Sequence, residues 1–89
     1  MAIRGDDELA EVVGQVPGVK VMRHYRGDPP HAENCYLHLA AEDEAAVHML
    51  CRLSARANAP LHVYEQSESE LRYTLVVNNY SRRVLLFSH

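Results

Sequence analysis

Apolar and polar positions along the chain follow two different periods. Residues 42–58, EDEAAVHMLCRLSARAN, have helical periodicity, and at 100° per residue one stripe of this segment contains Ala46, Leu50, Leu53, Ser54 and Ala57. Acidic residues open the segment and Arg52 and Arg56 close it, which complements the helix macrodipole. Asn58 suits a left-handed cap, and Pro60 prevents continuation. The pattern predicts an amphipathic helix with a buried stripe.

A second, shorter helix is predicted near the N-terminus. Residues 6–16 repeat apolar side chains at helical spacing, namely Leu9, Val12, Val13 and Val16. Asp6 or Asp7 can cap this helix, and Pro17 with Gly18 ends it. We expect residues 1–5 to form a flexible end.

Alternating patterns predict strands at residues 19–25, 35–41, 61–65, 71–78 and 82–88. Residues 26–34, RGDPPHAEN, separate the first two strands, so these form a hairpin with a long, stiff tip. A strand, helix, strand unit normally makes a right-handed parallel crossover. The second and third strands are therefore predicted to be parallel neighbours or to be separated by one strand. Asn78 and Asn79 suit a tight reversal before the last strand.

The predicted elements follow the order α-β-β-α-β-β-β. This order predicts one α+β domain over residues 1–89, with two helices on one face of a five-stranded, mostly antiparallel sheet. No motif identifies a family.

The last two predicted strands are apolar on both faces. One face carries Tyr73, Leu75 and Val77 and the other Val76, and Leu85 and Phe87 oppose Val84 and Leu86 in the same way. A half-solvated sheet should alternate more cleanly, and an exposed apolar patch usually marks an interface. We therefore expect a homodimer, held through the strand edge or through the candidate interface of Tyr73, Leu75, Val77, Leu85 and Phe87. The alternative is a sheet that curls enough to bury both faces in a monomer.

Composition narrows the choice of environment and partner. The net charge of −3 argues against a nucleic-acid partner, because non-specific binders normally carry a basic excess. No apolar run approaches the ~20 residues of a membrane span, and no N-terminal signal peptide is recognisable. Cys35 and Cys51 fall inside predicted elements, where two buried, reduced thiols are expected. We predict a cytoplasmic protein with no membrane partner.

Cys35-x-x-His38 and His48-x-x-Cys51 have the compact spacing of metal-ligand pairs. Residues three apart on a strand point to opposite faces, so Cys35 and His38 should not converge. The four glycines form no phosphate-binding fingerprint. We therefore expect no metal and no cofactor.

Two groups of side chains could carry chemistry. Asp28, His31 and Glu33 cluster in the hairpin loop. A carboxylate beside an imidazole can orient the ring for general acid and base catalysis. Aromatic and basic residues that could stack single-stranded RNA bases are Arg23, Tyr25, Arg26, Arg72, Tyr73, Tyr80, Arg82 and Arg83. An enzyme using His31 with Asp28 or Glu33, and a single-stranded nucleic-acid-binding module, are thus the two alternatives.

The preferred interpretation is a small, non-catalytic accessory or regulatory binding module that contacts a protein partner or a small ligand. Rigidly held loops commonly supply recognition. The candidate recognition loop consists of Arg23, Tyr25, Arg26, Asp28, His31 and Glu33.

Overall fold

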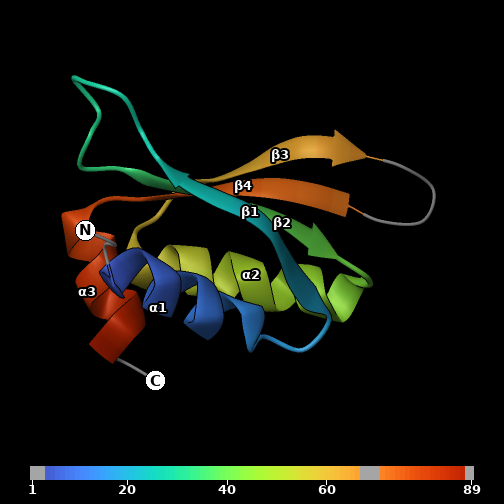
Figure 1. Cartoon of the computed structure of the whole chain (residues 1–89). Coiled ribbons are helices and arrows are strands. Elements are labelled where there is room, and N and C mark those ends of the chain that lie inside the picture. The colour runs from blue at the N-terminus through green and yellow to red at the C-terminus, as the bar shows by residue number, and fades with distance from the viewer. Residues whose placement is uncertain (1–3, 67–70, 88–89) are drawn as a thin grey trace.

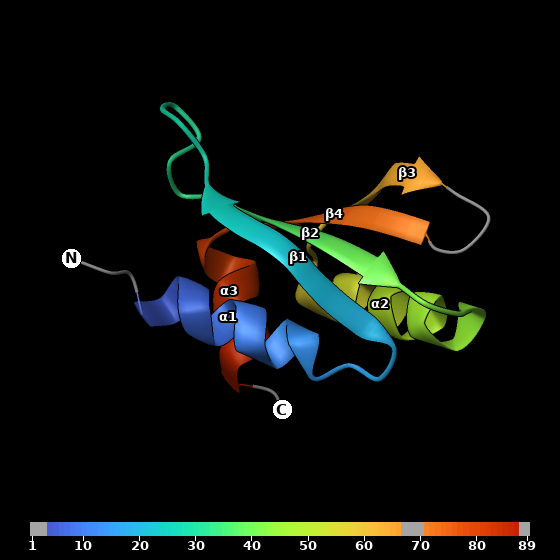
Figure 2. The ribbon, with the colours of Figure 1, turned by 45° about the vertical axis from the view of Figure 1, so that its right-hand side comes forward.

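The structure is a computed structural model that describes residues 4–66 and 71–87. Its elements are α1 (Arg4–Gly14), β1 (Val19–Arg26), β2 (Cys35–Ala41), α2 (Glu44–Ala57), β3 (Leu61–Gln66), β4 (Leu71–Val77) and α3 (Asn79–Phe87). The four strands form one antiparallel sheet in the order β1-β2-β4-β3. All three helices lie on one side of it (Figures 1 and 2). The α+β class is confirmed, but the prediction of two helices and a five-stranded sheet is wrong.

The strand order resolves the alternatives left by the crossover. β2 and β3 both pair antiparallel with β4, which lies between them. They are therefore parallel to one another and separated by one strand, as one of the two predicted arrangements has it.

A register shift between Val21 and Arg23 changes which face of the sheet the side chains of β1 occupy. Before the shift, Val21 lies opposite Leu39 and faces the helices. After the shift, Arg23 lies opposite His38, and a bulge of this kind places two residues of one strand against one of its partner. Odd-numbered residues of β1 therefore move from the helix side to the outer side of the sheet.

His24 shows that even-numbered residues of β1 face the helices after the register shift. It pairs with Leu37, whose side chain is fully buried under the helices. Its Nε2 lies 4.0 Å from the Asp7 carboxylate of α1. The imidazole thus faces the helix layer, which leaves the neighbouring positions on the outer face.

The predicted central helix is confirmed with slightly narrower bounds. Asp43 has extended backbone angles, and its carboxylate accepts a 2.9 Å hydrogen bond from the Ala46 amide, so the helix begins at Glu44. Asn58 ends it in the left-handed region with φ 54°, as predicted. Members of the predicted stripe are buried or half-buried: Ala46, Leu50, Leu53, Ser54 and Ala57.

The predicted strand at residues 82–88 is wrong, because residues 79–87 form α3 and residue 88 lies outside the described part. The Asn78 side-chain oxygen accepts a 2.9 Å bond from the Ser81 amide. The Ser81 hydroxyl in turn accepts a 2.8 Å bond from the Asn78 amide. This reciprocal pair is the capping box of a helix N-terminus, so Asn78 starts a helix where a strand reversal was predicted.

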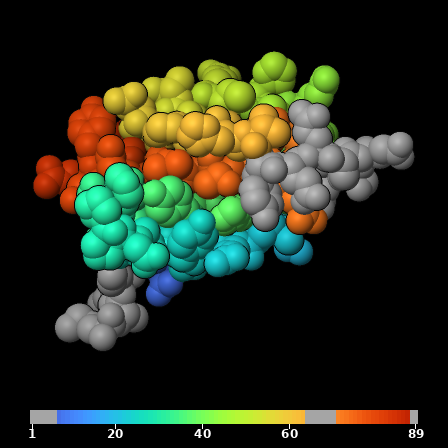
Figure 3. Space-filling model, turned by 90° about the horizontal axis from the view of Figure 1, so that it is seen from above, coloured from blue at the N-terminus to red at the C-terminus, as the bar shows by residue number. Residues whose placement is uncertain are grey.

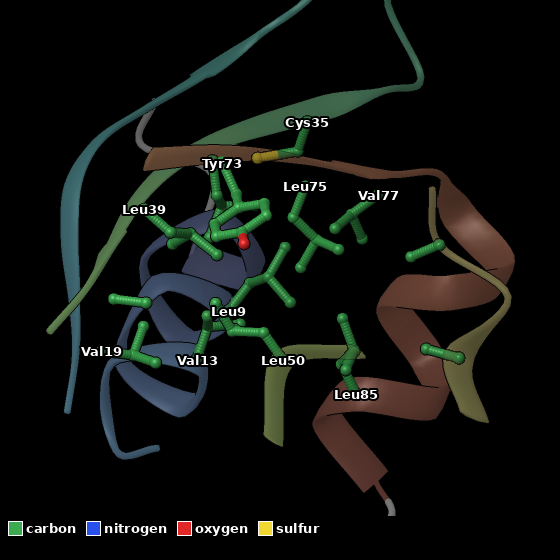
Figure 4. Packing of buried hydrophobic residues seen from close by; sticks show 14 of the residues in the cluster. Leu9, Val13, Val19, Cys35, Leu39, Leu50, Tyr73, Leu75, Val77 and Leu85 are labelled. Atoms are coloured by element: carbon green, nitrogen blue, oxygen red, sulfur yellow. The ribbon is translucent and has the colours of Figure 1, made fainter. Parts of the chain in front are cut away.

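The core fills the space between the sheet and the helices (Figure 4). Its buried members include Leu9 and Val13 from α1, Leu50 from α2 and Leu85 from α3. The strands contribute Cys35, Leu37, Leu39, Tyr73, Leu75 and Val77. α3 packs against both α1 and α2 at one end of the layer, and α1 and α2 contact each other less.

The structure also corrects the expectations for the N-terminal residues and for the two cysteines. Arg4 and Gly5 belong to α1 and so are not part of a flexible end, and residues 1–3 lie outside the described residues. Both cysteines are free thiols, but only Cys35 is buried, because Cys51 lies on the exposed side of α2.

Candidate recognition surface on the sheet

One face of the sheet has no helix over it (Figure 3). The space-filling view shows β1 in cyan, β2 in green, β4 in orange and β3 in gold lying side by side across this face. Strand register places on this open face Lys20, Arg23, Tyr25, Tyr36, His38, Ala40, His62, Arg72, Thr74 and Val76. Two members, Arg23 and Tyr25, belong to the recognition loop predicted from the sequence.

A group of stacked rings occupies the β1 and β2 part of the open face. The rings of Tyr25 and Tyr36 are 5.4 Å apart between centroids and tilted by 24°, and those of Tyr25 and His38 are 5.5 Å apart and tilted by 23°. The Tyr25 hydroxyl and His38 Nε2 share a 3.3 Å hydrogen bond. The guanidinium carbon of Arg23 lies 4.8 Å from the Tyr25 ring centroid, within cation–π range. We call these four residues the ring stack.

The side chains of the ring stack hold one another in place and are still accessible to a ligand. Aromatic pairs at these separations attract one another beyond the area that they bury, so the rings hold each other in place. Tyr25 nevertheless remains 39% exposed. The stack is therefore a prearranged apolar surface with a cationic edge, and sequence reasoning missed Tyr36 and His38 as its members.

Charge is unevenly distributed over the open face. Of the side chains that the structure describes there, Lys20, Arg23 and Arg72 are cations and none is a carboxylate. Glu65 lies opposite Arg72 in the register, and its side chain is outside the described part. The described strand positions of this face thus carry positive charge, while Glu42, just after β2, lines a pocket together with Lys20 and Ala40.

The hairpin loop rises at the other end of the face, on the side away from the helices (Figures 1 and 2). Its base closes through a 2.9 Å bond from the Gly27 amide to the Asn34 carbonyl and a 2.7 Å bond from the His31 amide to the Asp28 carbonyl. Arg26 is half-buried and donates a 3.0 Å bond from Nη1 to the Ala32 carbonyl. Arg26 thus supports the loop from beneath.

The candidate catalytic residues Asp28, His31 and Glu33 all have exposed side chains in this loop. The contacts on which the loop's shape depends come from its backbone and from Arg26. An exposed acid and imidazole lack the enclosed pocket in which such groups usually work. The enzyme alternative stays a prediction.

The candidate interface residues occupy different environments. Tyr73, Leu75, Val77 and Leu85 are buried within the chain's own core, whereas Phe87 at the end of α3 is 82% exposed. The helices and the sheet of one chain therefore enclose the first four of these side chains, and only Phe87 is left uncovered. The homodimer stays a prediction, but this surface no longer supports it.

The predicted group of aromatic and basic residues is divided between distant parts of the fold. Tyr73 is buried in the core, and Arg72 lies on the open face. The remaining C-terminal members belong to α3: Tyr80, Arg82 and Arg83. The structure brings only Arg23, Tyr25 and Arg72 onto one face.

The predicted metal-ligand pairs do not converge. Cys35 faces the core and His38 the open face, while His48 and Cys51 are exposed on α2. Within residues 4–66 and 71–87, no three His, Cys, Asp or Glu side chains are grouped closely enough to hold a metal ion. In the same part of the chain, no helix has both the length and the apolar character needed to cross a membrane.

No protein-family model, curated protein or solved structure matches the chain.

Proposed function

We propose that the protein is a non-catalytic binding module that recognises an acidic, extended segment of a partner protein on the open face of its sheet. The observation that carries this proposal is the ring stack, in which Arg23 lies over Tyr25 on a face that no helix covers. Tyrosine and arginine, together with tryptophan, are enriched at the positions of protein interfaces that contribute most of the binding energy.

The distribution of charge over the open face supports an acidic ligand and a direction for that ligand along the face. Lys20 and Arg23 line one end of the face, whereas the exposed carboxylates of Asp28 and Glu33 are in the loop at the other. Glutamates of the ligand would lie toward Lys20, and an apolar or aromatic side chain would lie against Tyr25. Such complementarity fixes orientation and raises the association rate more than it raises affinity.

A tryptophan-containing peptide provides a direct test, because the protein has no tryptophan. Titrating protein into a glutamate-rich peptide with a single tryptophan should shift the peptide's fluorescence, and the shift should weaken as salt is added. A lysine-rich peptide with the same tryptophan should not respond. Tyr25→Ala should weaken binding about tenfold, which corresponds to a hot-spot loss of about 1.4 kcal/mol.

Two variants with the same change of charge separate this site from general electrostatics. Lys20→Glu alters the open face, and Arg56→Glu alters exposed α2 on the helix side. Only Lys20→Glu should weaken peptide binding. Equal losses from both variants would contradict the proposal, and so would competition by a single-stranded oligonucleotide that binds more tightly than the peptide. The predicted cytoplasmic location stays a prediction that fractionation of the host cell would test.

A further inference from the structure

A groove runs between α1 and α2 on the helix side of the molecule. Its volume is about 610 Å³. Its apolar lining comes from Val12 of α1, Val16 in the turn that follows α1, Met49 and Leu53 of α2, and Leu85 of α3. Met49 remains 44% exposed in spite of its apolar side chain. The groove exists because α1 and α2 pack against α3 more than against each other.

The two sides of the groove carry opposite charges. On the α2 side, Arg52 and Arg56 line the groove one turn apart, are exposed and make no ion pair with any residue in the described ranges. On the α1 side, Glu8 lies one helical turn before the lining residue Val12, and Glu11 lies one turn after Glu8 in the same helix. Both glutamates are exposed. The groove therefore has an acidic α1 side and a basic α2 side.

We propose that this groove is the surface through which two copies of the chain associate. α1 and α2 run in opposite directions along it (Figures 1 and 2). A two-fold axis parallel to the groove places the acidic α1 of each copy over the basic α2 of the other. An axis across the groove would instead place α1 on α1, with like charges in contact. The charge pattern therefore favours the arrangement with the axis parallel to the groove. In it, the same surface of both copies is used, and its acidic side meets the basic side of the other copy.

The size of the protein is compatible with this arrangement. The chain exposes 5799 Å². A standard interface buries about 800 Å² per partner, or roughly a seventh of that surface. The groove and both its sides lie opposite the ring stack, so self-association through α1 and α2 leaves the open face accessible. The dimer does not depend on the proposed peptide-binding function, and either can fail alone.

Sedimentation velocity over about 1 to 200 µM protein tests the inference, since weak symmetric dimers dissociate in this range. The wild-type chain should shift from monomer to dimer with concentration. Arg56→Glu and Glu11→Arg should each raise the dissociation constant at least about tenfold, through like-charge contact. The double variant Glu11→Arg with Arg56→Glu should restore dimerisation, because each new charge then meets an opposite charge on the other copy, while Glu8 and Arg52 keep their attraction. Lys20→Glu, on the open face, should dimerise like the wild type.

Circular dichroism establishes that each variant is folded before its mass is compared. A wild-type monomer at every concentration would overturn the inference. So would undiminished dimerisation of Arg56→Glu, or a folded double variant that stays monomeric. A dimer disrupted by Lys20→Glu and unaffected by Arg56→Glu would place the interface on the sheet and overturn the groove proposal as well.

Discussion

At the scale of single residues, three glycines differ in what a side chain would meet. A Cβ on Gly27 would lie 2.6 Å from the His31 carbonyl oxygen and 2.9 Å from Tyr36 Cε2. Residue 27 can therefore lie between the His31 carbonyl and the Tyr36 ring only if it has no side chain. Gly18 has φ +81° and little free space, so it is restricted by its backbone as well. A Cβ on Gly14 would meet only Val21 Cγ2, at an ordinary 3.6 Å.

This contrast makes Gly27→Ala a test of the loop geometry. The new methyl group must displace backbone, so we expect a loss of about 1–3 kcal/mol in the free energy of unfolding. Peptide binding should weaken too, because Tyr36 would have to move. Gly14→Ala is the matched control and should be neutral or stabilising by up to about 1 kcal/mol. Urea denaturation measures both, and equal effects of the two substitutions would contradict the structure of the loop.

At the scale of elements, α3 depends on its first turn. Asn78 and Ser81 satisfy each other's backbone amides, and the Ser81 side chain is fully buried. The adjacent Asn79 is exposed, and its side-chain oxygen accepts a 3.1 Å bond from Arg82 Nη1. Two neighbouring asparagines thus have different roles, one as the helix cap and one on the surface.

We therefore expect Asn78→Ala to destabilise the protein by about 1 kcal/mol, the usual cost of losing an N-cap. Asn79→Ala should change stability by less than about 0.5 kcal/mol, as for most surface positions. Thermal unfolding followed by circular dichroism compares the two variants under identical conditions. Similar melting temperatures for both variants would argue against the capping role, and therefore against a helix that begins at Asn79.

The same elements show what could be predicted from the sequence. α2 was predictable because its periodicity and its cap Asn58 agreed with one another. α3 was not, because Val84 to Phe87 are four consecutive apolar residues, and such a run fits a strand and a helix equally well. The spacing of Asn78 and Ser81 was the available signal, since a helix cap needs partners three residues apart.

The ring stack was only half predictable, for a different physical reason. Alternation along β2 puts Tyr36 and His38 on the face opposite Cys35, Leu37 and Leu39, as the burial of these residues shows. Whether Arg23 and Tyr25 join them depends on the register shift after Val21. A bulge is set by pairing with the neighbouring strand, so the local pattern of β1 could not reveal it.

At the scale of the whole molecule, the C-terminal helix decides which apolar surface is inside. Leu85 is 1% exposed and lies in the core beside α3 (Figure 4). Phe87, two residues later, is 82% exposed. In a strand these two side chains would share a face. In α3 they point in different directions, so one chain encloses the surface that was expected to need a partner.

Substituting each of these residues by alanine therefore distinguishes helix from strand in the folded protein. Leu85→Ala should cost about 2–5 kcal/mol, because it removes buried methyl groups and leaves a cavity. Out of a total stability of about 5–15 kcal/mol, this loss should lower the denaturation midpoint severely. Phe87→Ala should change stability by less than about 0.5 kcal/mol. The measurement is urea unfolding at a protein concentration too low for self-association, which removes any contribution from dimerisation. Comparable losses from both substitutions would mean that Leu85 and Phe87 share one buried face, as a strand requires, and that α3 does not close the core.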